Sequence, residues 1–269
     1  MKRVNPVALS SVPLLEDLYL TSGEDEFEAE YAEHGAEEGL CKEIRFPFDS
    51  KLNSKVRLYK GVPWALQVDA VVNSTTIHLD QTDEYKALYD GAGPGLQEEC
   101  AALGGCKTGE ARMTNAHNLP ASKVIHTVGP RYALRYATAA ENALCHAYRS
   151  CLEALVEEGL KSLSVGCIHL KSKGYPRNEA AHVAVRTVRR FLEKFGDKVD
   201  VIVFAISGPD YSHFAKVLPL YFPRSKAEED RAQKLLPENT GNESGELVIP
   251  ERDIRVASGP RGASWSLPG

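Results

Sequence analysis

The sequence has no apolar run that approaches the roughly 18–20 residues needed to cross a membrane. Its first twenty residues, MKRVNPVALSSVPLLEDLYL, lack the unbroken apolar core and the cleavage site of a secretion signal. The six cysteines include no CxxC pair and no zinc spacing with histidine, so neither a metal nor a cofactor is indicated. We expect reduced thiols, mostly buried, in a cytoplasmic protein, and a reactive thiol among them stays open.

Basic charge is also scarce at the beginning of the chain. Residues 1–50 carry 12 acidic and 4 basic side chains, whereas residues 51–224 carry 17 and 22. The mildly basic middle weakly favours an anionic ligand. Solvated surface charge without a partner explains the same balance.

The two ends differ in composition from the middle of the chain. GEDEFEAEYAEHGAEEG (23–39) has eight carboxylates and no basic side chain, which predicts a disordered segment over 1–50. Residues 225–269 are rich in Pro, Gly, Ser and charge, which predicts a flexible linker or tail. One domain is therefore expected over 51–224.

Within 51–224, strand and helix patterns alternate. Helical periodicity covers 84–101, 138–160, 178–196 and 210–221; strand-like runs cover 55–61, 68–74, 109–114, 123–130, 162–170 and 199–207. This alternation predicts an α/β domain with a central mixed, largely parallel sheet covered by helices on both sides.

Several segments together resemble one family. VDAVVNS (68–74), AGPGLQEECAALGGCKTGEARMTNAHNLPASKVIHTVGPRY (92–132) and KGYPRNEAAHVAVRTVRRFL (173–192) are similar to the macrodomain, the ADP-ribose-binding module. The resemblance covers about 170 residues in unbroken order and implies a three-layer αβα sandwich. VLPLYFPRS (217–225) is similar to a subfamily with a CRAL-TRIO domain downstream. Since this chain lacks that domain, we expect a truncated or short form.

The chain departs from the family pattern where the ligand is held. The aspartate that binds adenine in the family is replaced by Val62, although Trp64 nearby offers either a stacking surface or plain core packing. The family's NAAN becomes NSTT, so Asn73 keeps the first position and Thr76 takes that of the second asparagine. The resemblance implies a ribose-binding role for both, while Asn73 serves equally well as a turn residue.

The glycine run of the first phosphate loop aligns with Asp80–Asp83, whose carboxylates repel a diphosphate. The aspartate that activates water in the hydrolase branch aligns with Tyr85, and a histidine common there aligns with Tyr89. A phenol is a poor base at neutral pH. His126 is interpreted as structural, so no catalytic residue is expected.

The second phosphate loop, usually STGxxGYP, reads HLKSKGYP. Candidate ligand-binding residues are therefore Lys171, Ser172, Lys173, Gly174 and Tyr175, with the two lysines as point charges for phosphate or as solvated loop residues. The aromatic that covers adenine after the last strand is absent at Ser207 and Gly208.

Four hypotheses follow from this pattern. The first is a non-catalytic macrodomain-like module with a degenerate pocket and weak or altered recognition of an ADP-ribose-like nucleotide. The second is a residual ADP-ribosyl hydrolase that uses Asp80 or Asp83 with Asn73. The third is recognition of RNA or poly(ADP-ribose), with stacking by Trp64, Tyr85 and Tyr89 and positive charge from Lys171, Lys173, Arg177, Arg186, Arg189 and Arg190. The fourth is a scaffold whose acidic N-terminal segment contacts a protein partner or the basic domain of the same chain.

Overall fold

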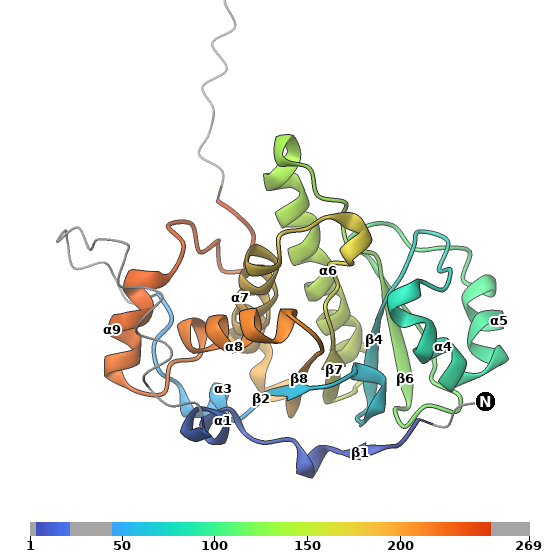
Figure 1. Cartoon of the computed structure of the whole chain (residues 1–269), viewed down its shortest axis with the longest axis horizontal. Helices are drawn as coiled ribbons and strands as arrows, with labels where there is room; N and C mark the ends of the chain where they lie inside the picture. Colours follow the sequence, from blue (N-terminus) through green and yellow to red (C-terminus); the bar gives the residue numbers. More distant parts are fainter. Residues whose placement is uncertain (1–3, 22–44, 249–269) are drawn as a thin grey trace, which may run out of the picture.

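A six-stranded sheet in the order β2-β8-β7-β4-β6-β5 crosses the molecule (Figure 1). The computed structural model describes residues 4–21 and 45–248. The strands are β2 (Val56–Lys60), β4 (Ala70–Ser74), β5 (Ala111–Asn115), β6 (Lys123–Thr127), β7 (Ser162–Val165) and β8 (Val201–Ile206). Neighbouring strands are parallel except β5 and β6, which are antiparallel. The prediction of a mixed, largely parallel sheet is confirmed.

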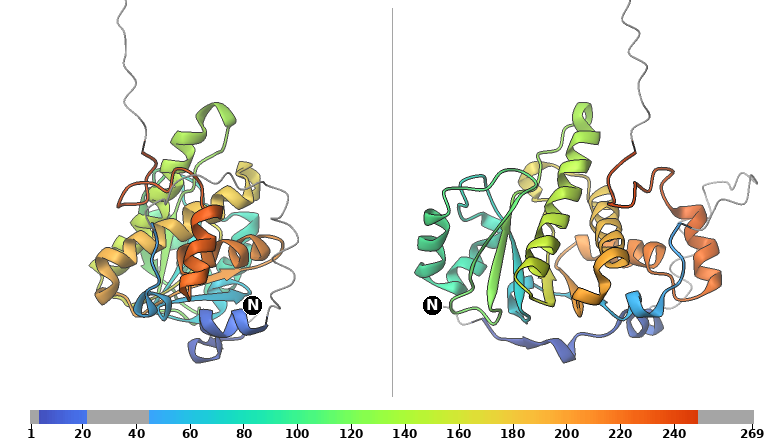
Figure 2. Two further views of the ribbon diagram at one scale, coloured as in Figure 1. Left: turned by 90° about the vertical axis from the view of Figure 1, so that its left-hand side faces the viewer. Right: turned by 180° about the vertical axis from the view of Figure 1, so that it is seen from behind.

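Helices cover both faces of this sheet (Figures 1 and 2). They are α3 (Ser50–Asn53), α4 (Lys86–Ala92), α5 (Pro94–Ala102), α6 (Ala137–Glu157), α7 (Arg177–Phe195) and α8 (Asp210–Tyr221). One core contains α6, α7 and α8, and a second core contains α4 and α5. Phe204 of β8 packs in the first core and its neighbour Val203 in the second, because successive side chains of a strand point to opposite faces. The predicted αβα sandwich is thus confirmed.

The predicted helix over 84–101 is interrupted. A 3₁₀ turn, η3 (Asp83–Tyr85), leads into α4, and α5 begins at Pro94. Between the two helices Gly93 has a φ of 88° and a ψ of −179°, a conformation that residues with a Cβ rarely adopt. Helical periodicity continues across the break, which is why the pattern alone predicted one helix.

The start of the chain packs against the sheet domain. β1 (Val7–Ala8) pairs in parallel with β3 (Leu66–Gln67), and α1 (Leu15–Thr21) follows. Arg57 of β2 donates to the carbonyl oxygens of Leu9 at 2.6 Å and Val12 at 2.9 Å. The expectation of disorder over 1–50 is therefore wrong for residues 4–21, and also for 45–50, where Phe46 is buried in the core. The acidic run 23–39 lies outside the described residues.

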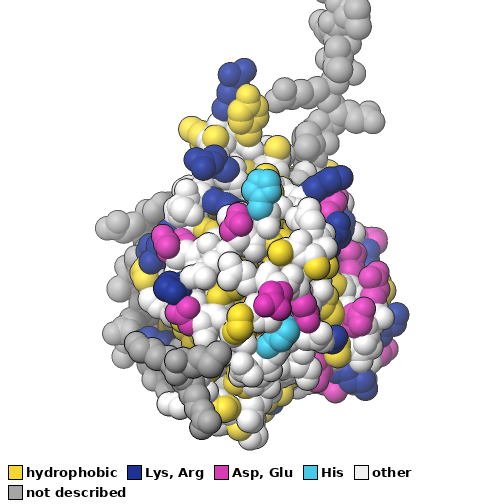
Figure 3. All heavy atoms as spheres, turned by 90° about the vertical axis from the view of Figure 1, so that its right-hand side faces the viewer, with side chains coloured by type: hydrophobic (Ala, Val, Ile, Leu, Met, Phe, Trp, Pro, Cys, Tyr) yellow, Lys and Arg dark blue, Asp and Glu magenta, His cyan; other side chains and the backbone are white. Residues whose placement is uncertain are grey.

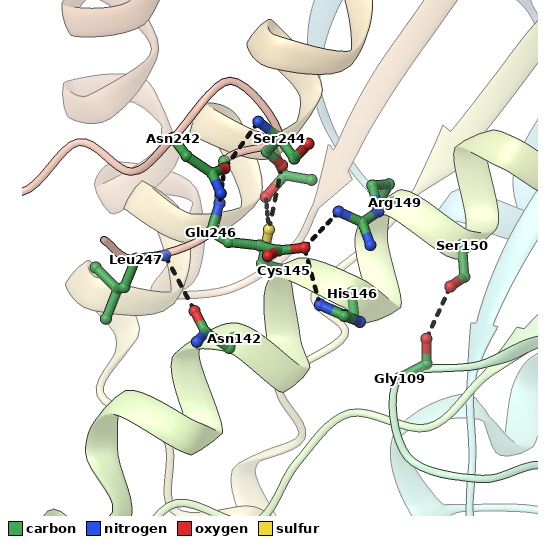
Figure 4. A network of polar contacts seen from close by, with 12 residues as sticks. Gly109, Asn142, Cys145, His146, Arg149, Ser150, Asn242, Ser244, Glu246 and Leu247 are labelled. Atoms are coloured by element: carbon green, nitrogen blue, oxygen red, sulfur yellow. Dashed lines mark hydrogen bonds and ion pairs between the residues drawn. The ribbon is translucent and has the colours of Figure 1, made fainter. Parts of the chain in front are cut away.

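The segment after residue 225 contains a helix, α9 (Lys226–Leu235), that the linker interpretation did not include. Residues 239–248 then cross α6 and α7 (Figure 4). Glu246 pairs with Arg149 at 2.5 Å and His146 at 3.0 Å, and the Leu247 amide donates to Asn142 Oδ1 at 3.0 Å. Polar composition was misleading here because the partners of these side chains lie about a hundred residues away in sequence. Residues 249–269 lie outside the described part.

Across the described ranges, the structure contains no helix with both the length and the apolar character of a membrane span.

Candidate functional site

The candidate site lies at the carboxyl ends of β4, β6 and β7, where open α/β sheets bind ligands. Two loops meet there. We call residues 75–83, after β4, the first loop, and residues 166–174, after β7, the second loop. Asn73 of β4 lies opposite His126 of β6 in the strand register, so both side chains belong to the floor beneath the loops.

Asn73 is turned into the protein. Its side chain is 0% exposed, and its amide nitrogen contacts His126 Nδ1 at 2.9 Å and the Tyr89 hydroxyl at 3.2 Å. Burial lowers the pKa of His126 to about 4 and raises the pKa of Tyr89 to about 12. At neutral pH the whole group is uncharged. It joins β4, β6 and α4 and presents neither a base nor an acid.

Thr76 organises the first loop from within. Its hydroxyl donates to Asp80 Oδ2 at 2.9 Å and accepts from the backbone amides of Asp80 at 3.1 Å and His78 at 3.3 Å. The Leu79 amide donates to the Thr76 carbonyl at 3.0 Å. The three consecutive amides of His78, Leu79 and Asp80 therefore all donate hydrogen bonds to Thr76.

Tyr85 joins the two loops. It is 5% exposed, and its hydroxyl donates to the Cys167 carbonyl of the second loop at 3.3 Å. A Cβ on Gly166 would stand 2.9 Å from this hydroxyl, so the glycine permits the close approach. Trp64, the candidate for base stacking, is buried and packs on Tyr85 with ring centroids 5.5 Å apart. Two of the three proposed stacking groups therefore pack against each other, with an angle of 57° between their ring planes.

Lys173 is the one second-loop candidate brought to the first loop. Its ammonium group donates to the Gly129 carbonyl at 2.6 Å and lies 3.5 Å from the Thr75 carbonyl. Burial lowers its pKa, and the positive charge of Arg131 adds to that effect. Lys171 and Ser172 are exposed and do not join it.

The remaining candidates shape the end of the second loop. Gly174 adopts a left-handed conformation with φ of 68°, which ends the 3₁₀ turn η5 (Lys171–Lys173) before α7. Tyr175 is buried against Tyr132, with ring centroids 4.8 Å apart. Gly174, Tyr175 and Pro176 thus form the turn that leads from the second loop into α7.

Main-chain groups of the second loop are also occupied. The Tyr148 hydroxyl of α6 accepts from the Ile168 amide at 3.3 Å and donates to the Gly166 carbonyl at 3.4 Å. The Lys173 and Gly174 amides donate to carbonyls within the loop. The helical periodicity over 138–160 includes Tyr148 but does not indicate this contact. The available signal was its hydroxyl, because a buried tyrosine oxygen needs a hydrogen-bond partner.

Cys167, His169 and Asp210 place three metal-ligand atoms within 4.8 Å of one another. The sequence did not reveal this cluster because Asp210 of α8 lies 41 residues after His169 of the second loop. His169 Nε2 is 3.5 Å from Asp210 Oδ1, and its Nδ1 is buried without a hydrogen-bond partner among the described residues. Arg177 Nε lies 3.4 Å from the same Asp210 oxygen. Because this guanidinium already neutralises the carboxylate, the cluster favours an internal ion pair over a divalent cation.

Two arginines of α7, Arg186 and Arg189, do not contribute to a surface for polyanions. Arg186 and Arg189 are each 1% exposed. Arg186 donates to Glu141 at 2.7 Å and to the Gly245 carbonyl at 3.0 Å, while Arg189 donates to Glu193 at 2.8 Å. The Gly245 carbonyl of the segment 239–248 covers Arg186, and the Pro47 carbonyl accepts from Arg189 at 2.8 Å. These two side chains are removed from the polyanion hypothesis.

The sheet order, the two helical layers and the paired loops at the carboxyl ends of β4 and β7 define a macro domain. The chain belongs to this family: the Macro domain profile matches residues 72–184. A crystal structure of the macro domain of ganglioside-induced differentiation-associated protein 2 (GDAP2) superposes with a TM-score of 0.71 at 36% identity, covering 82% of this chain and 98% of that one.

Other relatives support the same assignment. The chain is 46% identical over 217 residues to the GDAP2 homolog of Nematostella vectensis, covering 80% of this chain and 43% of that protein. It thus spans less than half the length of that curated relative. The Trypanosoma brucei macrodomain solved in complex with ADP-ribose is similar at 29% identity with a TM-score of 0.62, covering 80% of this chain and 78% of that one.

Proposed function

We propose that this macro domain is a non-catalytic binding module that recognises ADP-ribose or a related nucleotide weakly or in an altered way. The carrying observation is that several main-chain amides of both loops already donate hydrogen bonds to other groups of the protein. In the first loop they point to Thr76. In the second loop, Ile168 binds Tyr148 and the η5 amides bind carbonyls of the same loop. A diphosphate held by main-chain amides would have to break these bonds first.

The charges of the two loops support the same proposal. Asp80 and Asp83 place carboxylates on the first loop, where they repel a diphosphate. The cations on the other side are Lys171, which is exposed, and Lys173, which is already bonded to two carbonyl groups. An anion therefore gains little from this pair of loops.

The absence of hydrolase activity is part of the proposal. Tyr85 replaces the carboxylate that the family resemblance places there, and burial raises its pKa far above neutrality. His126 is buried and neutral, with a pKa of about 4. Asp80, the alternative base, is hydrogen-bonded to Thr76. A general base must be able to take a proton near the operating pH, and neither the Tyr85 phenol nor the His126 ring meets this condition.

Titration calorimetry with ADP-ribose tests the binding proposal, with the Trypanosoma brucei macrodomain measured beside it. We expect affinity weaker by at least about a hundredfold, because loss of two hydrogen bonds to a charged group has about that effect. A matched assay follows the release of ADP-ribose from a mono-ADP-ribosylated protein. Binding as tight as that of the comparison protein would refute the proposal that recognition of ADP-ribose is weak. Turnover that disappears in Asp80→Ala with Asp83→Ala would establish the hydrolase instead.

We also propose a cytoplasmic location. Cys100, Cys106, Cys145, Cys151 and Cys167 are free thiols in the structure. Thiols persist in the reducing cytosol, whereas secreted domains usually oxidise them. Cell fractionation with thiol labelling before lysis checks this proposal, and labelling of the native protein from outside intact cells would contradict it.

A further inference from the structure

A projection at the start of α6 exposes large apolar side chains. Figures 1 and 2 show the yellow-green end of α6 standing out from the body of the protein. Its apex is the 3₁₀ turn η4 (Leu134–Tyr136), where Leu134 is 83% exposed and Tyr136 is 61% exposed. Most large apolar side chains of this fold are buried, so the exposure of two at one apex requires an explanation.

The apex is also basic. Arg131 and Arg135 are exposed, and the segment 128–140 contains no acidic residue. The Arg135 guanidinium lies 5.6 Å from the centre of the Tyr136 ring. Figure 3 shows hydrophobic and basic side chains together at the top of the projection. A cationic rim around an apolar tip is complementary to an anionic surface with an apolar interior.

The base of the projection is fixed. The Tyr132 amide donates to the Lys173 carbonyl at 2.9 Å, and the Tyr132 ring packs on Tyr175 with centroids 4.8 Å apart. Within the apex, the Tyr136 amide donates to the Ala133 carbonyl at 2.8 Å. The apolar tip is therefore presented in a defined turn by a helix of 21 residues.

We propose that this apex docks the protein onto the surface of a membrane that contains anionic phospholipids. Leu134 enters the boundary of the acyl chains, Tyr136 lies at the headgroup level that tyrosine favours, and Arg131 and Arg135 contact lipid phosphates. The apex is convex and has four consecutive exposed residues, Ala133–Tyr136. A stable protein interface uses about 20–30 residues on each side, so a partner protein fits this shape less well than a bilayer.

The net charge of the chain is −5, which alone would oppose binding to an anionic membrane. Charges more than about 8–10 Å from the lipid are screened at physiological salt, so the local arginines decide the interaction. Docking through one apex is reversible. Two apolar side chains give less anchoring than a lipid modification, which itself binds only marginally. The membrane proposal does not depend on whether the first and second loops bind a nucleotide.

Co-sedimentation of the full chain with vesicles provides the test. One vesicle contains phosphatidylcholine alone and the other contains about 30% phosphatidylserine, the headgroup that cationic surfaces favour. We expect binding to the anionic vesicles and at least fivefold weaker partitioning to the neutral ones, since one basic residue near the surface contributes about fivefold.

Two variants separate the apolar and the charged contributions. Leu134→Ala with Tyr136→Ala should reduce partitioning about tenfold, and Arg131→Gln with Arg135→Gln should reduce it about 25-fold on anionic vesicles only. Phe48→Ala is the apolar control and Lys107→Gln with Lys161→Gln is the charge control, since all three residues are exposed elsewhere. Circular dichroism verifies that every variant is folded.

Three results would overturn the proposal. They are the absence of binding to anionic vesicles, binding that neither apex variant reduces, and vesicle binding that the control variants reduce equally. If light scattering instead shows self-association that the Leu134 and Tyr136 changes abolish, with no vesicle binding, the apex contacts protein and the membrane proposal is wrong.

Discussion

The hydroxyl of Tyr85 lies 3.3 Å from the carbonyl oxygen of Cys167, so a side chain at the start of the α4 region reaches across to the second loop. The Tyr85 ring lies between the first and second loops and packs against Trp64 on one side. We expect this contact to hold the two loops together and to keep a nucleotide out of the space between them.

Replacement of Tyr85 by alanine should therefore have two opposite effects. The free energy of unfolding should fall by about 3–5 kcal/mol, as for other buried aromatic side chains. At the same time, ADP-ribose affinity measured by calorimetry should rise above that of the parent protein. Tyr85→Phe keeps the ring and serves as the control, with a stability loss of about 1 kcal/mol and no gain in affinity. Unchanged or weaker binding in Tyr85→Ala would show that the tyrosine does not prevent a nucleotide from binding between the first and second loops.

Lys173 and Lys171 are two residues apart yet should respond differently to substitution. Lys173→Met removes the donor to the Gly129 and Thr75 carbonyl groups and should cost about 1–3 kcal/mol in urea unfolding. Lys171→Met changes an exposed side chain and should stay within about 0.5 kcal/mol of the parent protein. Equal effects would mean that the inward contacts of Lys173 do not stabilise the loops.

His126 predicts an acid sensitivity. Its pKa falls from 6.5 to about 4 in the folded protein because burial disfavours the charged ring. The unfolded chain therefore binds a proton between these values while the folded chain does not, so stability decreases as pH falls from about 6.5 to 4. The loss from this residue is about 2–3 kcal/mol at pH 4.5.

The measurement compares urea unfolding at pH 7 and pH 4.5. His126→Gln should be less stable than the parent protein at pH 7 but should lose less stability on acidification. The exposed His78→Gln serves as the control. If His126→Gln and the parent protein lose the same free energy between the two pH values, the buried histidine does not carry the acid sensitivity.

The segment 239–248, which packs over Arg186, predicts the effect of shortening the chain. A protein that ends at residue 238 loses the Gly245 carbonyl that accepts from Arg186 and the Glu246 carboxylate that pairs with Arg149. We expect the melting temperature to fall by several degrees, because exposing a buried charge-assisted contact costs about 1.5–3 kcal/mol. Removal of residues 249–269 alone is the matched comparison. If both truncated proteins have the same melting temperature, the segment 239–248 does not contribute to stability.

The sheet and most helices were predictable because their signal is local. Apolar residues in β8 alternate between two cores, and α6 and α7 carry an apolar face, so the sequence period reports the structure directly. The break at Gly93 was missed because a glycine within a helical pattern is tolerated, and only its backbone conformation identifies the boundary.

The site was harder to predict because its contacts are distant in sequence. Alignment with the family identified positions such as Asn73 and Lys173, but it did not show where their side chains point. Asn73 is turned towards His126, 53 residues away, and Lys173 towards Gly129, 44 residues away. The secondary-structure propensity of a residue does not report which distant residue its side chain contacts. The exposure of Leu134 was equally invisible, because an apolar residue near a helix start is usually expected in the core.

Gly129 sets a practical limit on any redesign of this protein. A methyl group at that position would stand 2.7 Å from the carbonyl oxygen of Ile168, which is part of the backbone and cannot rotate away. A mutagenesis library aimed at a new ligand preference should therefore keep this glycine fixed. Its diversity belongs at positions 171 and 172, where the side chains face solvent and variation leaves the scaffold intact.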